Sequence, residues 1–314
     1  MPTGRAKSVM RNKDFENRVV RYRDLVPCYN AFVDTRTPGS EAKENFTIIG
    51  PGVSENPEQF VHIKEPHGFN IGGARQPPGC VNSQHSHKTA EVFVVHTGTW
   101  RFDFGEDGDD AQVVLEEGDV VSIPTNVFRG FTNVGDDIGY LYAVLGQDDP
   151  GHVTWASAVF ELAKDHGLVL LESGMLVDTT RGETIPQGAA VMSPPGREEL
   201  ASMGRVTPDQ AEEYVWRELA ESPKSIELIG PKGIYPWDHG FNLRRDILVK
   251  GETLERPAPD APEVIFVHRG SVCISSADRQ LELGEGDTFS APQEVAYDIE
   301  ATDDTIAFIT TRAD

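Results

Sequence analysis

Cysteine is scarce in this chain, and long hydrophobic runs are absent. The 314 residues include three cysteines, Cys28, Cys80 and Cys273, which lie far apart and form no CxxC pair. This pattern excludes a disulfide framework and favours a reducing cytoplasm. No run approaches the roughly 18 apolar residues that a membrane span needs, and no apolar segment follows the basic first residues. We therefore expect a cytoplasmic protein without a signal peptide or membrane partner.

Basic residues are also few. The chain has 28 Lys and Arg against 51 Asp and Glu, which gives a net charge of −23. Such a chain repels a polyanion of phosphates, so nucleic acid is excluded as a partner. The length allows about two domains, each able to bury a core without disulfides or a structural metal.

The stretch from residue 79 to residue 98 is the most informative part of the sequence. Gly79, His85, His87, Glu91 and Gly98 are separated by five, one, three and six residues. Two His at i and i+2 project to the same face of an extended strand, and Glu91 joins them if the segment stays extended. Two imidazoles and a carboxylate converging on one point suit a divalent ion such as Fe, Mn, Ni, Zn or Co. We predict that these three side chains bind a metal.

This spacing resembles the first signature motif of the cupin superfamily, G-x5-H-x-H-x3-E-x6-G, at every fixed position. The second cupin motif, G-x5-P-x-G-x2-H-x3-N, follows one hairpin later, with Gly118, Pro124 and Asn133 in place. Asn126 stands where that motif has Gly, and Arg129 stands where it has His. In metal-binding cupins this His is the usual last ligand, so the resemblance implies a cupin barrel whose metal lacks that ligand.

The sequence also contains an internal repeat. HGFNI at 67–71 recurs as HGFNL at 239–243, an offset of 172. LEEGDVVSIP at 115–124 recurs as LGEGDTFSAP at 283–292, an offset of 168, so the second copy has lost four residues in an intervening hairpin. Ordered repeats of this length predict a duplicated fold.

We therefore predict an all-β protein with two cupin (double-stranded β-helix or jelly-roll) barrels in one chain, a bicupin. The expected parts are an N-terminal arm at 1–60, barrel 1 at 61–150, a helical and irregular linker at 151–234, and barrel 2 at 235–314. Within the linker, apolar spacing predicts helices at 155–167 and 207–222, the latter with Thr207 as N-cap.

The second barrel has a different residue set. The repeat places Pro257 and Pro259 where His85 and His87 stand, and neither can ligate a metal. Tyr297 stands at the second-motif His position, so Glu263 is left alone. A lone carboxylate does not hold a transition metal, and we predict that barrel 2 is metal-free.

The remaining motif histidines have a different interpretation. His96 and His268 share one repeat position, and His67 and His239 share another. Because each pair recurs in a barrel without metal ligands, we expect packing or hydrogen-bonding roles for them. Gln84 points to the opposite face of its strand and is not expected to be a ligand.

Arg129 is the position on which function depends. A guanidinium stays protonated and cannot ligate a cation. Three arrangements are open: Arg129 clamps the carboxylate of a metal-bound substrate, pairs with Glu91, or turns to the barrel rim. We favour the substrate clamp as its catalytic role.

Two His and one carboxylate with open positions match the donor set of non-haem Fe(II) enzymes. The resemblance to dioxygenase-type bicupins implies the same chemistry. We expect an Fe(II)-dependent oxygenase of a small carboxylated metabolite, aromatic acids included, with a mostly apolar cavity formed by residues such as Phe93, Val95, Phe128 and Phe131.

Two other functions stay open at this point. The first is a redox-neutral isomerase or decarboxylase that uses Mn, Ni or Zn, and the second is a non-catalytic protein that binds a small acid. Open sheet edges need covering, so we expect a homodimer.

Overall fold

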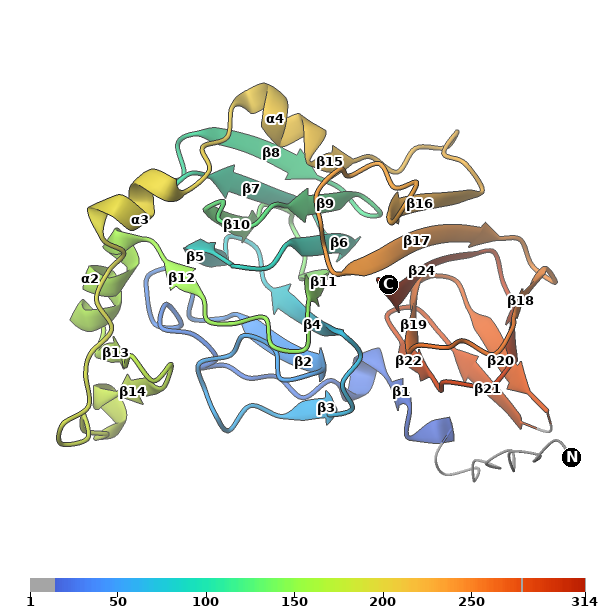
Figure 1. The fold of residues 1–314 in the computed structure, drawn as a ribbon, viewed down its shortest axis with the longest axis horizontal. Helices are drawn as coiled ribbons and strands as arrows, with labels where there is room; N and C mark the ends of the chain where they lie inside the picture. Colours follow the sequence, from blue (N-terminus) through green and yellow to red (C-terminus); the bar gives the residue numbers. More distant parts are fainter. Residues whose placement is uncertain (1–14, 278, 314) are drawn as a thin grey trace, which may run out of the picture. The chain divides into compact units, whose positions relative to one another are not determined.

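The computed structural model of the chain describes residues 15–277 and 279–313, which form two compact units (Figure 1). The first unit contains residues 26–223, 227–242 and 312–313. The second unit contains residues 15–25, 224–226 and 243–311. Strands are the main regular structure of each unit, so the predicted all-β fold is confirmed.

Two large sheets form the core of the first unit. Its strands are β2 (Glu44–Ile49), β3 (Val61–Ile63), β4 (Phe69–Gln76), β5 (Val81–Ser86), β6 (Glu91–Thr97), β7 (Trp100–Phe104), β8 (Ala111–Leu115), β9 (Val120–Ile123), β10 (Arg129–Asn133), β11 (Gly139–Gly146), β12 (Thr154–Trp155) and β15 (Val215–Trp216). One sheet has the order β15-β9-β6-β11-β4-β2-β3, and the other has the order β12-β5-β10-β7-β8. The metal motif crosses from the second of these sheets to the first, because β5 and β6 belong to different sheets.

The core of the first unit is formed by side chains from both sheets. Phe93 and Val95 of β6 pack with Trp100 and Phe102 of β7 and with Phe131 of β10 in one buried cluster. Inward and outward residues alternate along a strand that covers a core with one face. β8 follows this rule, since its five residues are alternately buried and exposed.

The second unit repeats this arrangement. Its sheets use β1 (Val19–Val20), β16 (Ser225–Ile229), β17 (Phe241–Leu248), β18 (Thr253–Arg256), β19 (Glu263–Arg269), β20 (Val272–Ser276), β21 (Arg279–Leu283), β22 (Thr288–Ala291), β23 (Tyr297–Ala301) and β24 (Thr305–Arg312). The orders are β1-β22-β19-β24-β17-β16 and β18-β23-β20-β21. β16, β17 and β24 run across the boundary between the units.

The internal repeat is confirmed strand by strand. β4 and β17, β6 and β19, and β7 and β20 begin 172 residues apart, whereas β8 and β21, β9 and β22, and β10 and β23 begin 168 residues apart. The offset changes between β20 and β21, so the four lost residues lie in that hairpin, as the sequence predicts.

The segment between the barrels is only partly as predicted. Its helices are α2 (Ser157–Asp165), α3 (Arg197–Ser202) and α4 (Pro208–Glu213), and it also contains the hairpin of β13 (Leu168–Leu170) and β14 (Leu176–Asp178) and the 3-10 helix η2 (Thr179–Arg181). Thr207 caps α4 through a capping box with Gln210, as expected. The expectation of a helix up to residue 222 is wrong, because Val215 and Trp216 instead pair with β9 as an edge strand.

Residues 26–60 contribute directly to the first barrel. β2 pairs with β4, so this part of the expected arm forms sheet structure beside the metal motif. Residues 15–25, with β1 and the 3-10 helix η1 (Tyr22–Asp24), belong to the second unit instead. Residues 1–14 of the expected arm lie outside the described part of the chain. In the described residues, no helix is long and apolar enough to cross a membrane.

The backbone conformation of Asn126 explains how this residue replaces the Gly of the second cupin motif. It has φ 58°, in the left-handed region that favours Gly. Asn adopts this region more readily than other non-Gly residues, since its short polar side chain can hydrogen-bond locally. The turn before β10 therefore keeps its shape without the motif Gly.

Candidate metal centre

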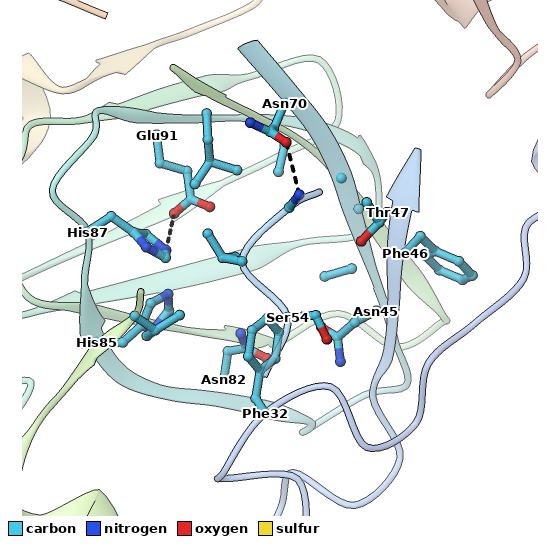
Figure 2. A pocket seen from close by; sticks show the side chains of 18 of the residues that line it. Phe32, Asn45, Phe46, Thr47, Ser54, Asn70, Asn82, His85, His87 and Glu91 are labelled. Atoms are coloured by element: carbon cyan, nitrogen blue, oxygen red, sulfur yellow. Dashed lines mark hydrogen bonds and ion pairs between the residues drawn. The ribbon is translucent and has the colours of Figure 1, made fainter. Parts of the chain in front are cut away.

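The structure brings the three predicted ligands together. His85, His87 and Glu91 each offer a ligand atom, and these atoms lie within 4.8 Å of one another. All three residues are buried, and their side chains lie together on one side of the pocket (Figure 2). Among the described residues, this is the one group of three or more His, Cys, Asp or Glu side chains placed to share an ion.

Glu91 does not reach the site along one extended strand that also carries the two histidines. The chain is not extended from His85 to Glu91, because β5 ends at Ser86 and β6 begins at Glu91. The bend between them carries the chain to the other sheet, and His87 lies within it. The His pair and the carboxylate thus approach the site from two sheets.

Arg129 pairs with Glu91, which is one of the three arrangements that the sequence left open. It lies directly opposite His85 in the pairing of β10 with β5. Its guanidinium is buried, forms an ion pair with the Glu91 carboxylate, and donates to the His85 carbonyl at 3.2 Å. It therefore does not turn to the barrel rim, and its role as a substrate clamp stays a prediction.

Burial sets the protonation of the site. It lowers the pKa of His85 and His87 well below the usual value, and the positive charge of Arg129 lowers both further. Burial also raises the pKa of Glu91, an effect that Arg129 opposes. The imidazoles are therefore neutral at physiological pH, which is the form that ligates a metal.

The donor set fits a divalent metal. His85 donates from Nδ1 to the Ser83 carbonyl at 2.7 Å, which leaves the Nε2 lone pair free for a ligand. His87 Nδ1 is buried and has no hydrogen-bond partner among the described residues, and its Nε2 lies 3.7 Å from Glu91 Oε2. Buried polar atoms without partners are rare in proteins. Ligation of an ion by the two neutral imidazoles and the carboxylate would give the His87 ring the partner that it lacks.

The N-terminal segment holds the His85 strand in place. The Ser83 N–H donates to Asp34 Oδ2 at 3.0 Å, and the other Asp34 oxygen accepts from Lys43 in an ion pair with both side chains fully buried. Residues around metal ligands commonly fix the orientation of those ligands. Asp34 and Lys43 thus support the Ser83 residue whose carbonyl orients the His85 ring.

Glu55 is a further buried carboxyl group near the site. Glu55 accepts from the Trp155 indole N–H and from the Val33 N–H, both at 2.6 Å. The Trp155 ring lies 5.3 Å from the His85 ring, centroid to centroid. Burial raises the pKa of Glu55 to about 8, because its ionised form would lose its water shell.

The three candidate ligands open into a pocket. It encloses about 70 Å³, and its apolar wall includes the predicted residues Phe93 and Phe131 together with Trp155. Val95 and Phe128, also predicted, lie in neighbouring core clusters instead. Gln84 faces away as expected, and its Nε2 donates to the Asp103 carbonyl at 3.2 Å.

The second unit carries a different cluster at the equivalent place. Glu263 is buried at the start of β19, as Glu91 is at the start of β6. Its carboxylate accepts from Arg256 Nε at 3.0 Å and also from the Tyr297 hydroxyl. The sequence left Glu263 alone and missed Arg256 as its partner.

A bulge explains why the repeat did not reveal Arg256. In the first unit the β5–β10 register shifts between Arg129 and Phe131, so His85 falls opposite Arg129. β18 and β23 pair without a shift, which puts Arg256 opposite Tyr297. One extra residue in a strand moves every later position by one. Arg256, rather than Pro257, is therefore the positional counterpart of His85.

The other motif histidines lie outside the ligand cluster. His96 packs against Tyr140 and His268 against Phe308, with ring centroids 5.8 and 5.9 Å apart. His239 shares a 2.6 Å hydrogen bond with the Ser122 hydroxyl. These contacts agree with the packing and hydrogen-bonding roles expected from the repeat.

Comparison with known proteins agrees with the fold and the motif. Residues 74–145 match the model of the cupin domain family Cupin_2. A germin-like protein, subfamily 1 member 7, of Arabidopsis thaliana is 36% identical over 88 residues, which are 26% of this chain and 38% of that protein. The match therefore spans well under half of the germin-like protein.

Solved structures extend the likeness to the whole chain. Oxalate decarboxylase from Bacillus subtilis at pH 4.6 superposes with a TM-score of 0.56 and 12% identity, over 95% of this chain and 76% of that one. A structure of the same enzyme from work on its Mn(II) centres has a TM-score of 0.55 and 13% identity, over 95% and 77%. The chain thus contains a region similar to the cupin domain at residues 74–145, and it has the two-barrel fold of these solved structures.

Lys43→Met is expected to destabilise the protein by about 3–5 kcal/mol, because it leaves the Asp34 carboxylate buried without its cation. Urea unfolding measures this difference. The matched variant Asp34→Asn/Lys43→Met removes both charges and should recover most of the loss. A single variant as stable as the wild type would contradict the role of the pair.

Glu55→Gln is expected to change how stability depends on pH. The folded state holds a proton on Glu55 up to about pH 8, whereas the unfolded chain releases it near the usual value of 4.5. Wild-type stability therefore falls as pH rises between these values, by at most about 1.4 kcal/mol per unit from this group. Thermal unfolding of both proteins from pH 5 to 9 measures it. If the stability of the wild type and of the variant changed with pH in parallel, Glu55 would not be the source of the pH dependence.

Proposed function

We propose that this bicupin is a metal-dependent enzyme, a non-haem Fe(II) oxygenase of a small carboxylated metabolite. The observation that carries the proposal is the buried cluster of His85, His87 and Glu91 at the wall of an apolar pocket. His85, His87 and Glu91 would hold Fe(II), which would supply oxygen chemistry on a bound substrate.

The chain's own residues prepare this site in three ways. Hydrogen bonding of His85 to the Ser83 carbonyl fixes the tautomer that presents Nε2. Burial keeps the imidazoles neutral, so no proton competes with the metal. The rings of Phe93 and Phe131 exclude bulk water, which protects reactive chemistry and strengthens local electrostatics.

We also propose that Arg129 holds the acid group of the substrate. In the structure its guanidinium is paired with Glu91 and does not line the pocket, so this contact requires Glu91 to turn toward the metal first. A carboxylate that ligates a cation gives most of its negative charge to that cation, and a buried guanidinium then needs another anion. The substrate's carboxylate, bound beside the metal, would meet this need.

A second candidate function is a redox-neutral reaction such as decarboxylation or isomerisation. It is favoured by the Mn(II) centres named for the oxalate decarboxylase of the same fold. This enzyme would work without O₂ and with Mn, Ni or Zn. A non-catalytic protein that binds a small acid is the remaining alternative, and its ligand would stabilise the protein even after chelation. The homodimer is likewise a proposal, which light scattering checks.

The purified protein is expected to take up about one Fe(II) per chain, and His85→Ala/His87→Ala should take up none, because a lone buried carboxylate does not hold the ion. Mass spectrometry of the metal content measures both. His152→Ala, which removes an exposed histidine, is the matched control and should bind as the wild type does.

Oxygen consumption then separates the candidate functions. The Fe(II)-loaded protein should consume O₂ with a member of a panel of hydroxy and aromatic acids, and His85→Ala should not. Turnover in the absence of O₂ with Mn(II) would favour the redox-neutral enzyme. Absence of metal uptake by the wild type would contradict both enzymatic proposals.

A further inference from the structure

The wall of the pocket that faces the candidate ligands carries polar side chains among apolar ones. Figure 2 shows His85, His87 and Glu91 on one side, and Asn45 and Thr47 on the other. Asn45 and Thr47 are two residues apart on β2, so their side chains share one face of that strand. This wall comes from the segment between Cys28 and His62, which carries no cupin motif.

Two polar atoms in this wall have no partner among the described residues. Asn45 Nδ2 and Gln59 Oε1 are both buried and make no hydrogen bond. The other end of the Gln59 amide is occupied, since Nε2 donates to the Thr47 hydroxyl. Buried donors and acceptors are costly to leave unmet, so a pair of them beside one pocket indicates that a ligand completes them.

Other amides of the same pocket are engaged in structure. Asn70 accepts from the Gly52 N–H at 2.9 Å and donates to the Gln147 carbonyl at 2.7 Å. Asn82 accepts from Gln76 Nε2 at 3.1 Å. Asn45 and Gln59 thus differ from their neighbours in having polar atoms left over.

The charge of the wall limits what these amides can bind. Among the residues that line the pocket there is no Lys, Arg or Asp, and Glu91 is the one formally charged side chain. A carboxylate at the Asn45 end would be desolvated without a cation, in a chain of net charge −23. An uncharged group that both accepts and donates hydrogen bonds meets no such penalty.

We propose that the substrate carries an uncharged hydrogen-bonding group, such as a carboxamide or a hydroxyl, at the end away from the metal. Asn45 and Gln59 bind this group, and Phe93 and Trp155 enclose a short apolar body between the two ends. The inference rests on the proposed function, because it takes the other end of the molecule to be the acid that chelates the metal. Asn45 and Gln59 are then the residues that determine specificity.

Three 2-hydroxy acids with the same chelating head test the proposal on Zn(II)-loaded protein. They are malamate, with a distal carboxamide, malate, with a distal carboxylate, and 2-hydroxy-4-methylpentanoate, with an apolar group of the same shape. Isothermal titration should show malamate binding at least about tenfold more tightly than either of the others, because the site's unmet amide groups discriminate against partners that leave them unpaired.

The variant Asn45→Leu separates recognition from folding. It should reduce the preference for malamate to within about threefold, since one hydrogen bond is lost. The same variant should unfold at a temperature equal to or above that of the wild type when no ligand is present, because it removes an unmet buried donor. Gln112→Leu, at an exposed amide on β8, is the matched control and should keep the wild-type preference.

Equal binding of malate and malamate, failure of all three acids to bind the zinc-loaded protein, or an unchanged preference in Asn45→Leu would each overturn the proposal. Failure of the wild type to take up zinc would contradict the proposed function instead.

Discussion

The ion pair between Arg129 and Glu91 is the interaction on which the site depends. Glu91 is buried where strands of two sheets meet, and a carboxylate in that position needs a positive partner. A divalent metal held by His85 and His87 can serve as that partner as well as Arg129 can. The Arg129 guanidinium and the metal therefore compete for the Glu91 carboxylate. Any other anion that binds Arg129, such as the acid group of a substrate, would favour metal binding.

The second unit meets the same constraint with its own side chains. Glu263 occupies the place of Glu91, and Arg256 and Tyr297 both donate to it. The arginine comes from β18 there and from β10 in the first unit, so the two copies reached a similar pairing from opposite strands. Duplication thus preserved a buried carboxylate twice, and the first copy alone has paired imidazoles beside it among the described residues.

The sequence predicted the parts of this protein that depend on local spacing. The repeat predicted both sets of strands and the shortened hairpin between β20 and β21, because strand positions recur at fixed offsets. The motif also identified His85, His87 and Glu91, since residues so close in the chain can converge within one bend.

Contacts between distant residues could not be predicted in this way. Asp34 and Lys43 give no signal as a buried pair until β2 is seen beside the motif strands. Arg256 was missed because a bulge in the first barrel moves the alignment by one residue. The arrangement of Arg129 depended on a balance between burial and pairing, which the sequence left open among three outcomes.

The metal site is tested most directly by a crystal structure of the protein soaked anaerobically with Fe(II), with anomalous diffraction recorded at the iron edge. If the three residues bind the metal, one anomalous peak appears in the first unit, ligated by His85, His87 and Glu91, with the Glu91 carboxylate turned from Arg129 toward the ion. An intact pair of Arg129 and Glu91 with no peak beside the two histidines would contradict metal binding by these residues.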